Sequence, residues 1–290
     1  MDTAGQTGRP DEDGASASGD GVAYQGRPGA FGEGAARRVG GEVPFATVPC
    51  ATFEAVVEAL VSGRVRRAVL PVVNVLAGGV GAALDLVATR ADATVVGALT
   101  VPVALALIAP PGVAVEALRR VRSHPVALAQ CRRFFAAHPQ IEAVADFDTA
   151  GAVEAVVAAA RGDEAALAHT DAARVYGGCV LAEAVQDHPA NATRFFVLAR
   201  TADAPPVSPG ATAAVAVWTG RDAGLGAVLT ALAAAGWRLA HIERRPAPDL
   251  RPTAEAATGA APPGRFVLEI GGTGALPRVP GLVVRGAYAA

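Results

Sequence analysis

Polar side chains that could bind an anionic ligand stand at the ends of predicted elements in this chain of 290 residues. Arg194 carries a guanidinium that can bind a carboxylate through two parallel N–H bonds. Asn74 follows an apolar run, at the edge where open α/β sheets bind ligands. Ser123 and Thr149 stand at the starts of predicted helices, where backbone N–H groups attract anions. This pattern favours a site for a carboxylated ligand.

Each of these residues also has a structural interpretation. Arg194 could form a surface ion pair, and strand alternation would turn it away from its neighbour Thr193. Asn74 could shape the turn ahead of the following glycines, and Ser123 could be a helix N-cap. His124 beside it is a lone histidine, which is more often structural than catalytic, so we assign it to binding. The sequence holds no cluster of His, Cys and carboxylate residues that would bind a metal, and we expect no cofactor.

The elements that must position these residues follow an α/β pattern. From Gly21 onward, short β-branched runs alternate with Ala-rich helical stretches. The run Ala68–Val73 is continuously apolar, as in a strand buried on both faces. This alternation predicts doubly wound sheets. The other predicted elements are strands at Gly21–Tyr24, Thr94–Val96, Ala143–Asp146 and Phe195–Leu198, and helices at Gly34–Val39, Phe53–Ser62, Pro125–His138 and Thr149–Arg161.

Composition sets the predicted boundaries. Residues 1–20 are rich in Gly, Ser, Ala and Asp and predict a disordered tail. Residues 21–200 are predicted to form the first domain, with one doubly wound sheet or a pair of them, and 201–211, with three prolines in Thr201–Gly210, a stiff linker. Residues 212–290 form a second, smaller domain with strands at Thr212–Trp218, Arg238–Arg244, Arg265–Ile270 and Leu282–Arg285 around a helix at Leu225–Ala235. The glycines and prolines of Gly271–Gly281 exclude a second helix there.

Several classes of protein are excluded by composition. The net charge is −2, with both signs scattered, which argues against a nucleic-acid binder. The most apolar stretch, Ala93–Ala109, contains Pro102 and is shorter than the roughly 20 residues that a spanning helix needs. No export leader opens the chain, so we expect a cytoplasmic protein. We also expect reduced, buried thiols at the cysteines, which are Cys50, Cys131 and Cys179.

Six blocks, in order and with the right spacing, resemble the prephenate dehydratase family. Ser123–Cys131 reads SHPVALAQC, one residue away from the family's SHPQALAQC, and Asn191–Phe195 reads NATRF. A single tripeptide would be weak evidence, but the ordered set indicates common ancestry. The other blocks are Ala23–Ala36 (AYQGRPGAFGEGAA), Pro71–Val80 (PVVNVLAGGV), Asp148–Ala152 (DTAGA) and Ile242–Pro246 (IERRP).

The resemblance implies a fold and a reaction. The fold would be a two-lobed, periplasmic-binding-protein-like domain followed by a small ferredoxin-like ACT domain. The reaction would convert prephenate to phenylpyruvate with loss of water and CO₂, with Thr193 donating a hydrogen bond to the departing hydroxyl; Thr193 could instead cap the turn before its strand. The residues expected to bind prephenate or a similar dicarboxylate are Asn74, Gly78, Ser123, His124, Thr149, Arg194 and Phe195.

The resemblance also implies regulation and assembly. ACT domains of this family commonly bind phenylalanine at a dimer interface, so a homodimer or homotetramer is expected. The residues that correspond to the phenylalanine-sensing motifs are Ala223, Gly224, Leu225, Glu243 and Arg244. The arginine at 244 replaces the family's serine, and a dimerisation domain that binds nothing is the alternative.

The chain departs from the family at polar positions that we expect to line the cleft. The departures are Ala30, Gly32, Val73, Val75, Val126 and the pair Gly97-Ala98. Three hypotheses remain open. The protein could still be a prephenate dehydratase, it could be a non-aromatising prephenate decarboxylase of specialised metabolism, or it could be a non-catalytic ligand-binding relative. Retention of the TRF block and of the second domain argues against the decarboxylase.

Overall fold

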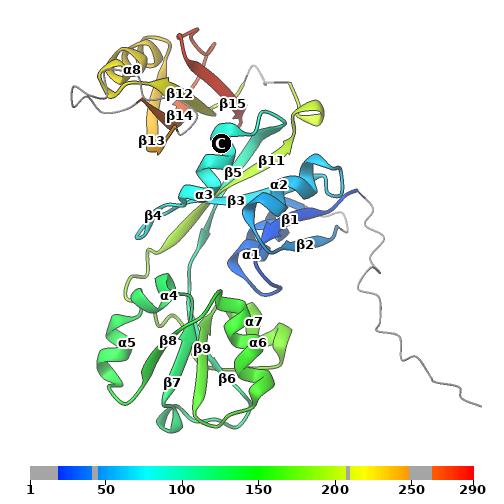
Figure 1. Ribbon diagram of the computed structural model, residues 1–290, viewed down its shortest axis with the longest axis vertical. Helices are drawn as coiled ribbons and strands as arrows, with labels where there is room; N and C mark the ends of the chain where they lie inside the picture. The colour runs from blue at the N-terminus through cyan, green and yellow to red at the C-terminus, as the bar shows by residue number, and fades with distance from the viewer. Residues whose placement is uncertain (1–18, 41–44, 207–209, 248–262) are drawn as a thin grey trace, which may run out of the picture.

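The computed structural model describes residues 19–40, 45–206, 210–247 and 263–290. Three sheets follow one another along the long axis of the molecule (Figure 1). The chain crosses from the first sheet to the second after β5 (Ala93–Pro102) and returns through β11 (Ala192–Arg200). The prediction of a disordered tail falls almost entirely on residues 1–18, outside the described residues.

The first lobe is a mixed sheet in the order β2-β1-β3-β11-β5, with the short β4 paired to β3. Strands β1, β2 and β3 run parallel, whereas β11 is antiparallel to both β3 and β5. The remaining strands are β1 (Val22–Gln25), β2 (Thr47–Cys50), β3 (Arg67–Asn74) and β4 (Gly78–Gly79). The helices are α1 (Phe31–Gly40), α2 (Phe53–Val61) and α3 (Gly81–Thr89).

The second lobe is a sheet in the order β10-β6-β9-β7-β8. Its strands are β6 (Ala106–Ala109), β7 (Arg120–Ser123), β8 (Glu142–Ala145), β9 (Glu164–Ala168) and β10 (Cys179–Ala182). Its helices are α4 (Pro125–Ala129), α5 (Arg132–Ala137), α6 (Thr149–Ala159) and α7 (Thr170–Tyr176), with a 3₁₀ turn at Val115–Ala117. The single helix predicted over Pro125–His138 is therefore wrong, because the helix is interrupted at Gln130–Cys131.

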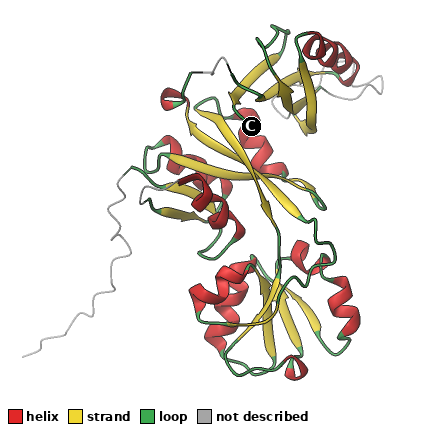
Figure 2. Ribbon diagram, turned by 180° about the vertical axis from the view of Figure 1, so that it is seen from behind, coloured by secondary structure: helices red, strands yellow, loops and turns green. Residues whose placement is uncertain are grey.

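The C-terminal unit is a sheet in the order β13-β14-β12-β15. Its elements are β12 (Ala213–Gly220), α8 (Leu225–Ala234), β13 (Trp237–Pro246), β14 (Gly264–Gly272) and β15 (Leu282–Tyr288), with 3₁₀ turns at Thr201–Asp203 and Asp222–Gly224. The described part of Gly271–Gly281 contains no helix, as predicted. The α/β fold class is confirmed, although the sheets of the two lobes are mixed rather than wholly parallel (Figure 2).

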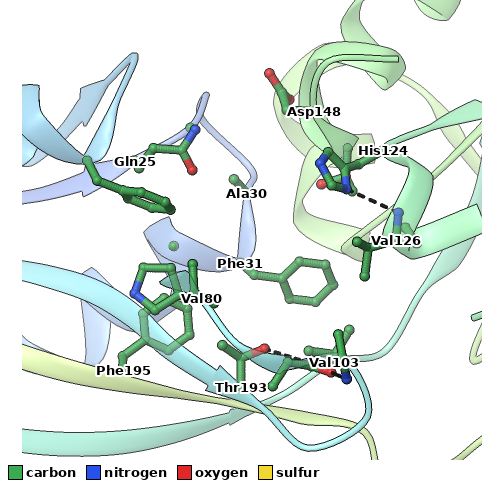
Figure 3. Close-up of a pocket in the computed structure, with 18 of the residues that line it drawn as sticks. Gln25, Ala30, Phe31, Val80, Val103, His124, Val126, Asp148, Thr193 and Phe195 are labelled. Atoms are coloured by element: carbon green, nitrogen blue, oxygen red, sulfur yellow. Dashed lines mark hydrogen bonds between the residues drawn. The ribbon is translucent and has the colours of Figure 1, made fainter. Parts of the chain in front are cut away.

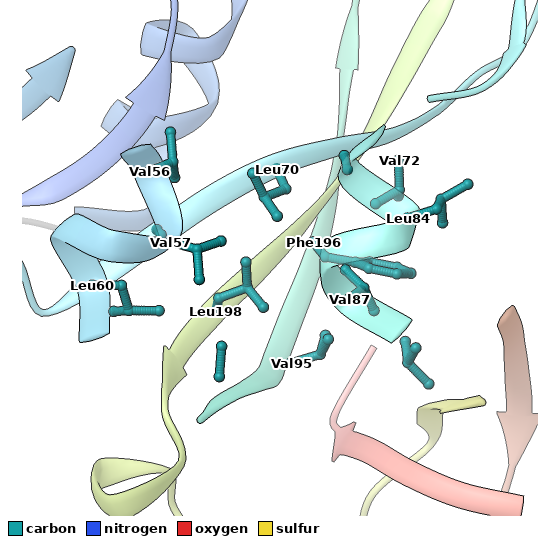
Figure 4. Packing of buried hydrophobic residues seen from close by; sticks show 14 of the residues in the cluster. Val56, Val57, Leu60, Leu70, Val72, Leu84, Val87, Val95, Phe196 and Leu198 are labelled. Atoms are coloured by element: carbon teal, nitrogen blue, oxygen red, sulfur yellow. The ribbon is translucent and has the colours of Figure 1, made fainter. Parts of the chain in front are cut away.

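The core is built from small aliphatic side chains. One cluster joins α2, α3, β3 and β11 through Leu60, Leu70, Leu84, Phe196 and Leu198 (Figure 4). The same cluster continues into the C-terminal sheet through residues of its lobe-facing side, Ala213, Val215, Val217, Val267 and Tyr288. The first lobe and the C-terminal sheet therefore share one hydrophobic core, despite the prolines of the predicted linker.

Candidate functional site

A cleft of about 690 Å³ lies between the two lobes. The first lobe contributes the loop after β1, the N-terminus of α2, the hairpin of β4, and residues of β3 and β11 (Figure 3). The second lobe contributes the N-termini of α4 and α6. The lining is mostly apolar, with Phe31 from α1 and Phe195 from β11 on the first-lobe side. This volume suits a ring-bearing metabolite.

A chain of hydrogen bonds positions Thr193 in this cleft. Asn74 Nδ2 donates to Thr193 Oγ1 at 3.0 Å and to Asn191 Oδ1 at 3.0 Å. Asn191 is 1% exposed, and its Nδ2 donates to Gln130 Oε1 at 2.9 Å. The relay therefore joins β3 and β11 of the first lobe to the end of α4 in the second lobe.

The backbone fixes the direction of these hydrogen bonds. Asn74 Oδ1 accepts from the backbone N–H groups of Leu76 and Ala77, at 3.0 and 2.9 Å. A backbone N–H can only donate, so the other end of the Asn74 amide must be its NH₂ group. Thr193 Oγ1 therefore accepts from Asn74, and its own proton remains available for a ligand. This orientation is what a hydrogen-bond donor to a leaving hydroxyl requires.

Two helix N-termini of the second lobe face the cleft. Asp148 caps α6 by accepting from Gly151 N at 2.5 Å, and Thr149 is the first residue of that helix. His124 caps α4, because its Nδ1 accepts from Val126 N at 3.2 Å. His124 and Thr149 both line the cleft, as predicted for binding residues, and so do Asn74, Gly78, Thr193 and Phe195.

The cleft carries little positive charge. Among the described residues that line it there is no arginine or lysine, whereas Glu54 and Asp148 contribute carboxylates. Beside the cleft, Arg27 of the loop after β1 pairs with Glu154 of α6 and lies 3.8 Å from Asp148. This ion pair joins the two lobes, so Arg27 is already occupied. A bound anion would depend on N–H groups and on amide and hydroxyl side chains.

Two predicted substrate-binding residues lie elsewhere. Arg194 turns to the opposite face of β11, where it pairs with Glu269 of the C-terminal sheet at 2.5 Å. Successive side chains of a strand alternate between faces, so Thr193 in the cleft forces Arg194 away from it. Ser123 is 0% exposed and donates from Oγ to Leu167 O at 2.6 Å. It joins β7 to β9 inside the sheet, so the prediction that it binds substrate or caps α4 is wrong.

The positions at which the chain departs from the family fall into two groups, one that lines the cleft and one that does not. Ala30, Gly32 and Val126 line the cleft. Val73 and Ala98 pack against the core of the first lobe instead, and Val75 is 64% exposed. The expectation that all these positions line the cleft is therefore wrong, because strand alternation sends part of them to the other face. Fewer polar contacts have been lost from the site than the sequence suggests.

Some site residues were missed. Gln130 and Asn191 lie inside matched blocks, but an isolated amide gives no signal that it joins a relay across two lobes. Glu54, Phe147 and Asp148 line the cleft as well. Phe147 is 78% exposed at the rim. In the sequence, the position of Phe147 between two aspartates was the available indication that this aromatic residue is exposed.

Four of the five residues predicted to sense phenylalanine come close together in the C-terminal unit. Ala223 and Gly224 form the turn before α8, which Leu225 begins. Arg244 on β13 donates to Asp222 at 3.0 Å, which joins the two motifs. Their neighbour Glu243 faces the first lobe, where its carboxylate lies against Gly79 of the cleft hairpin.

The remaining predictions concern cysteines, metals and membranes. Cys50 and Cys131 are buried free thiols, and burial raises the pKa of Cys131 to about 12. Cys179 is exposed, which corrects the expectation that every thiol is buried. Within the described ranges, no three His, Cys, Asp or Glu side chains gather as a metal site would require. No helix in the same ranges is long and apolar enough to cross a bilayer.

Comparison with known sequences points to one family. The sequence model of the prephenate dehydratase family matches residues 22–203. Arogenate dehydratase 1 of Petunia hybrida is 40% identical over 227 residues, which cover 78% of this chain and 53% of the relative. An Arabidopsis thaliana relative named arogenate dehydratase/prephenate dehydratase 2, chloroplastic, is 37% identical over 230 residues, 78% of this chain and 58% of the relative. The chain thus spans about half the length of these curated relatives.

Solved structures agree in fold. The prephenate dehydratase of Arthrobacter aurescens in complex with L-Phe has a TM-score of 0.79 at 27% identity, covering 93% of this chain and 90% of that one. GqqA, described as a novel type of quorum quenching acylase, has a TM-score of 0.76 at 30% identity, covering 93% of this chain and 97% of that one. Both similarities extend over the C-terminal sheet as well as the two lobes.

Proposed function

The chain belongs to the prephenate dehydratase family, and we propose that it is a lyase that removes water and CO₂ from prephenate to give phenylpyruvate. The observation that carries this proposal is the Thr193 hydroxyl, held by Asn74 in the cleft with its proton free. The reaction breaks the bond between the ring and the carboxylate. The electron pair of that bond enters the ring as the hydroxyl leaves from the opposite carbon, and the ring becomes aromatic.

The protein need supply little acid or base chemistry for this step. Aromatisation provides the driving force, so the cleft must orient the substrate and stabilise the departing oxygen. A threonine hydroxyl is a weak acid, and it acts by hydrogen bonding to the leaving group as charge develops there. The leaving hydroxide is released as water after taking up one proton from the solvent, and CO₂ carries no proton away.

Arogenate is the second candidate substrate, and the charge of the cleft favours it. Arogenate carries an ammonium group where prephenate has a keto group, so its net charge is less negative. The cleft places Glu54 and Asp148 at its lining and no described arginine or lysine there. These carboxylates would attract the ammonium group and repel a dianion. The plant relatives named arogenate dehydratase agree with this alternative.

Acylase activity, for which GqqA is named, receives less support. An acylase that used Thr193 as a nucleophile would need a base to accept the hydroxyl proton. The side-chain partner of Thr193 Oγ1 is the Asn74 NH₂ group, which only donates. The non-aromatising decarboxylase is also disfavoured. That reaction retains the ring hydroxyl of prephenate, so it does not need a hydrogen-bond donor to a departing hydroxyl.

One assay tests these alternatives together. Purified protein is incubated with prephenate and, separately, with arogenate, and the products are identified by mass. Phenylpyruvate from prephenate supports the proposal, and phenylalanine from arogenate supports the second candidate. CO₂ release without an aromatic product would indicate the decarboxylase. Binding without any turnover would indicate a ligand-binding relative. An N-acyl homoserine lactone serves as the control substrate for acylase activity.

We further propose that the C-terminal unit is an ACT-type domain that binds phenylalanine, in a homodimer or homotetramer in the cytoplasm. The Arthrobacter relative in complex with L-Phe supports the ligand. The contact between Arg244 and Asp222 supports a single site made by both motifs. Calorimetry with phenylalanine and size-exclusion chromatography with light scattering test the ligand and the assembly.

A further inference from the structure

Strand β11 carries the candidate donor on one face and a contact to the C-terminal sheet on the other. Thr193 lines the cleft, and the next residue, Arg194, meets Glu269 of β14. The Cα atoms of adjacent residues are about 3.8 Å apart. A displacement of Arg194 must therefore move the backbone that presents Thr193 to the cleft.

The contact is directional and partly buried, since the Arg194 side chain is 32% exposed. Arg194 Nε donates to Glu269 Oε1 at 2.9 Å and to Oε2 at 3.2 Å, and Nη2 donates to Oε1 at 2.5 Å. Tyr288 adds its hydroxyl to Glu269 Oε1 at 3.2 Å. Glu269 and Tyr288 are 8% and 5% exposed. Several hydrogen bonds in fixed geometry hold a side chain more tightly than a solvated ion pair does.

The sheet is irregular at this point. Opposite β3, Arg194 pairs with Val73 whereas Phe195 pairs with Pro71, so one residue of β3 is left out of the ladder. Such a bulge weakens the local pairing and re-aims side chains beside it. The irregularity is confined to the β3 side, because the pairing of Thr193 with Val101 and of Arg194 with Thr100 on β5 is regular. Thr193 is therefore held by a regular ladder on one side only, and an anchor on the other face of β11 adds a second constraint.

We propose that Arg194, Glu269 and Tyr288 are positioning residues through which the C-terminal sheet sets the position of Thr193 in the cleft. Glu269 lies on β14, paired with His241 on β13, two residues from Glu243. The three residues therefore also provide a direct route from the motif residues of β13 to the reaction. For its kinetic part, this inference rests on the proposed lyase function.

The structure offers a matched control for the test. Arg245 of β13 donates to Asp85 of α3 through Nε and Nη2, both at 2.8 Å. This second ion pair also joins the C-terminal sheet to the first lobe, with two hydrogen bonds, but it ends on α3 rather than on β11. An effect that comes only from docking of the two units should follow the loss of either pair.

The experiment compares Glu269→Gln with Asp85→Asn in the full chain. We expect kcat to fall about tenfold or more in Glu269→Gln with KM nearly unchanged, because a displaced donor weakens transition-state contacts. Asp85→Asn should retain kcat within about twofold. The double variant Arg194→Leu/Glu269→Leu leaves no unpaired buried charge, and it should fold while kcat stays low. Equal losses in Glu269→Gln and Asp85→Asn, or wild-type kcat in the double variant, would overturn the proposal.

Hydrogen–deuterium exchange separates this inference from the proposed function. Amides of residues 192–195 should exchange about tenfold faster in Glu269→Gln than in wild type or Asp85→Asn, without any substrate. If the wild type turns over neither prephenate nor arogenate, the proposed function fails while this measurement still tests the anchor. Unchanged exchange at these residues would refute the positioning role even in an active enzyme.

Discussion

Replacing Thr193 by valine removes the one hydroxyl on which the proposed chemistry depends. Valine has nearly the same shape and favours strands as strongly as threonine, so β11 should keep its register. The Asn74 NH₂ group would lose Thr193 Oγ1 but keep two acceptors, Asn191 Oδ1 at 3.0 Å and Ala192 O at 3.2 Å. The free energy of unfolding should therefore fall by only about 0.5–1.5 kcal/mol.

The catalytic cost should be much larger than this. Loss of one preorganised donor to a developing negative oxygen typically lowers kcat about 10²–10³-fold, or roughly 3–4 kcal/mol. Thr193→Ser keeps a hydroxyl near the same place and should remain within about tenfold of the wild type. The contrast between these two variants measures the hydroxyl rather than the fold.

Steady-state rates with prephenate and with arogenate, read as aromatic product, provide the assay. Urea unfolding of each variant checks that the stability change stays small. A Thr193→Val enzyme that works within about threefold of wild type would remove Thr193 from the mechanism. Equal losses in the valine and serine variants would point to a role for the methyl group or the backbone instead.

Three further predictions follow from other parts of the molecule. Gly286→Ala should loosen the packing of the C-terminal sheet on the first lobe, because an added Cβ would clash with the backbone oxygen of Val95 on β5. Thermal unfolding should show a loss of at least about 2 kcal/mol, and an unchanged midpoint would contradict the close contact. Burial would raise the pKa of Glu33, but hydrogen bonds from Gly29 N–H, Arg37 and Thr47 lower it below the ordinary value. The stabilisation from Glu33 should therefore be complete above about pH 5 and be lost as the pH falls through the lowered folded pKa. In urea titrations, the free energy of unfolding of Glu33→Gln should differ most from that of wild type near neutrality. Val126→Gln restores a polar group at an exposed position of the cleft lining. The variant should raise kcat/KM severalfold with little change in stability. An unchanged kcat/KM would mean that the altered cleft does not need that contact.

The sequence predicted that two helices bordering the site begin at Pro125 and Thr149, but it did not predict the residues that cap them. The structure has His124 as the N-cap of α4, where the sequence offered Ser123, and Asp148 as the N-cap of α6. The ordered blocks also predicted the two lobes and the placement of Asn74, Thr193 and Phe195 at the cleft. Missed elements such as β6 (Ala106–Ala109) and β10 (Cys179–Ala182) are short strands whose partners lie far along the chain.

What the sequence by itself determined is that Thr193 and Arg194 face opposite ways, because side chains alternate along any strand. Only the tertiary structure decided which of them meets the substrate, since that depends on which face the second lobe and the C-terminal sheet cover. The same holds for Ser123, which its sheet neighbours turn inward to Leu167. Local chemistry specifies what each residue can donate or accept, and long-range packing determines the group that it reaches.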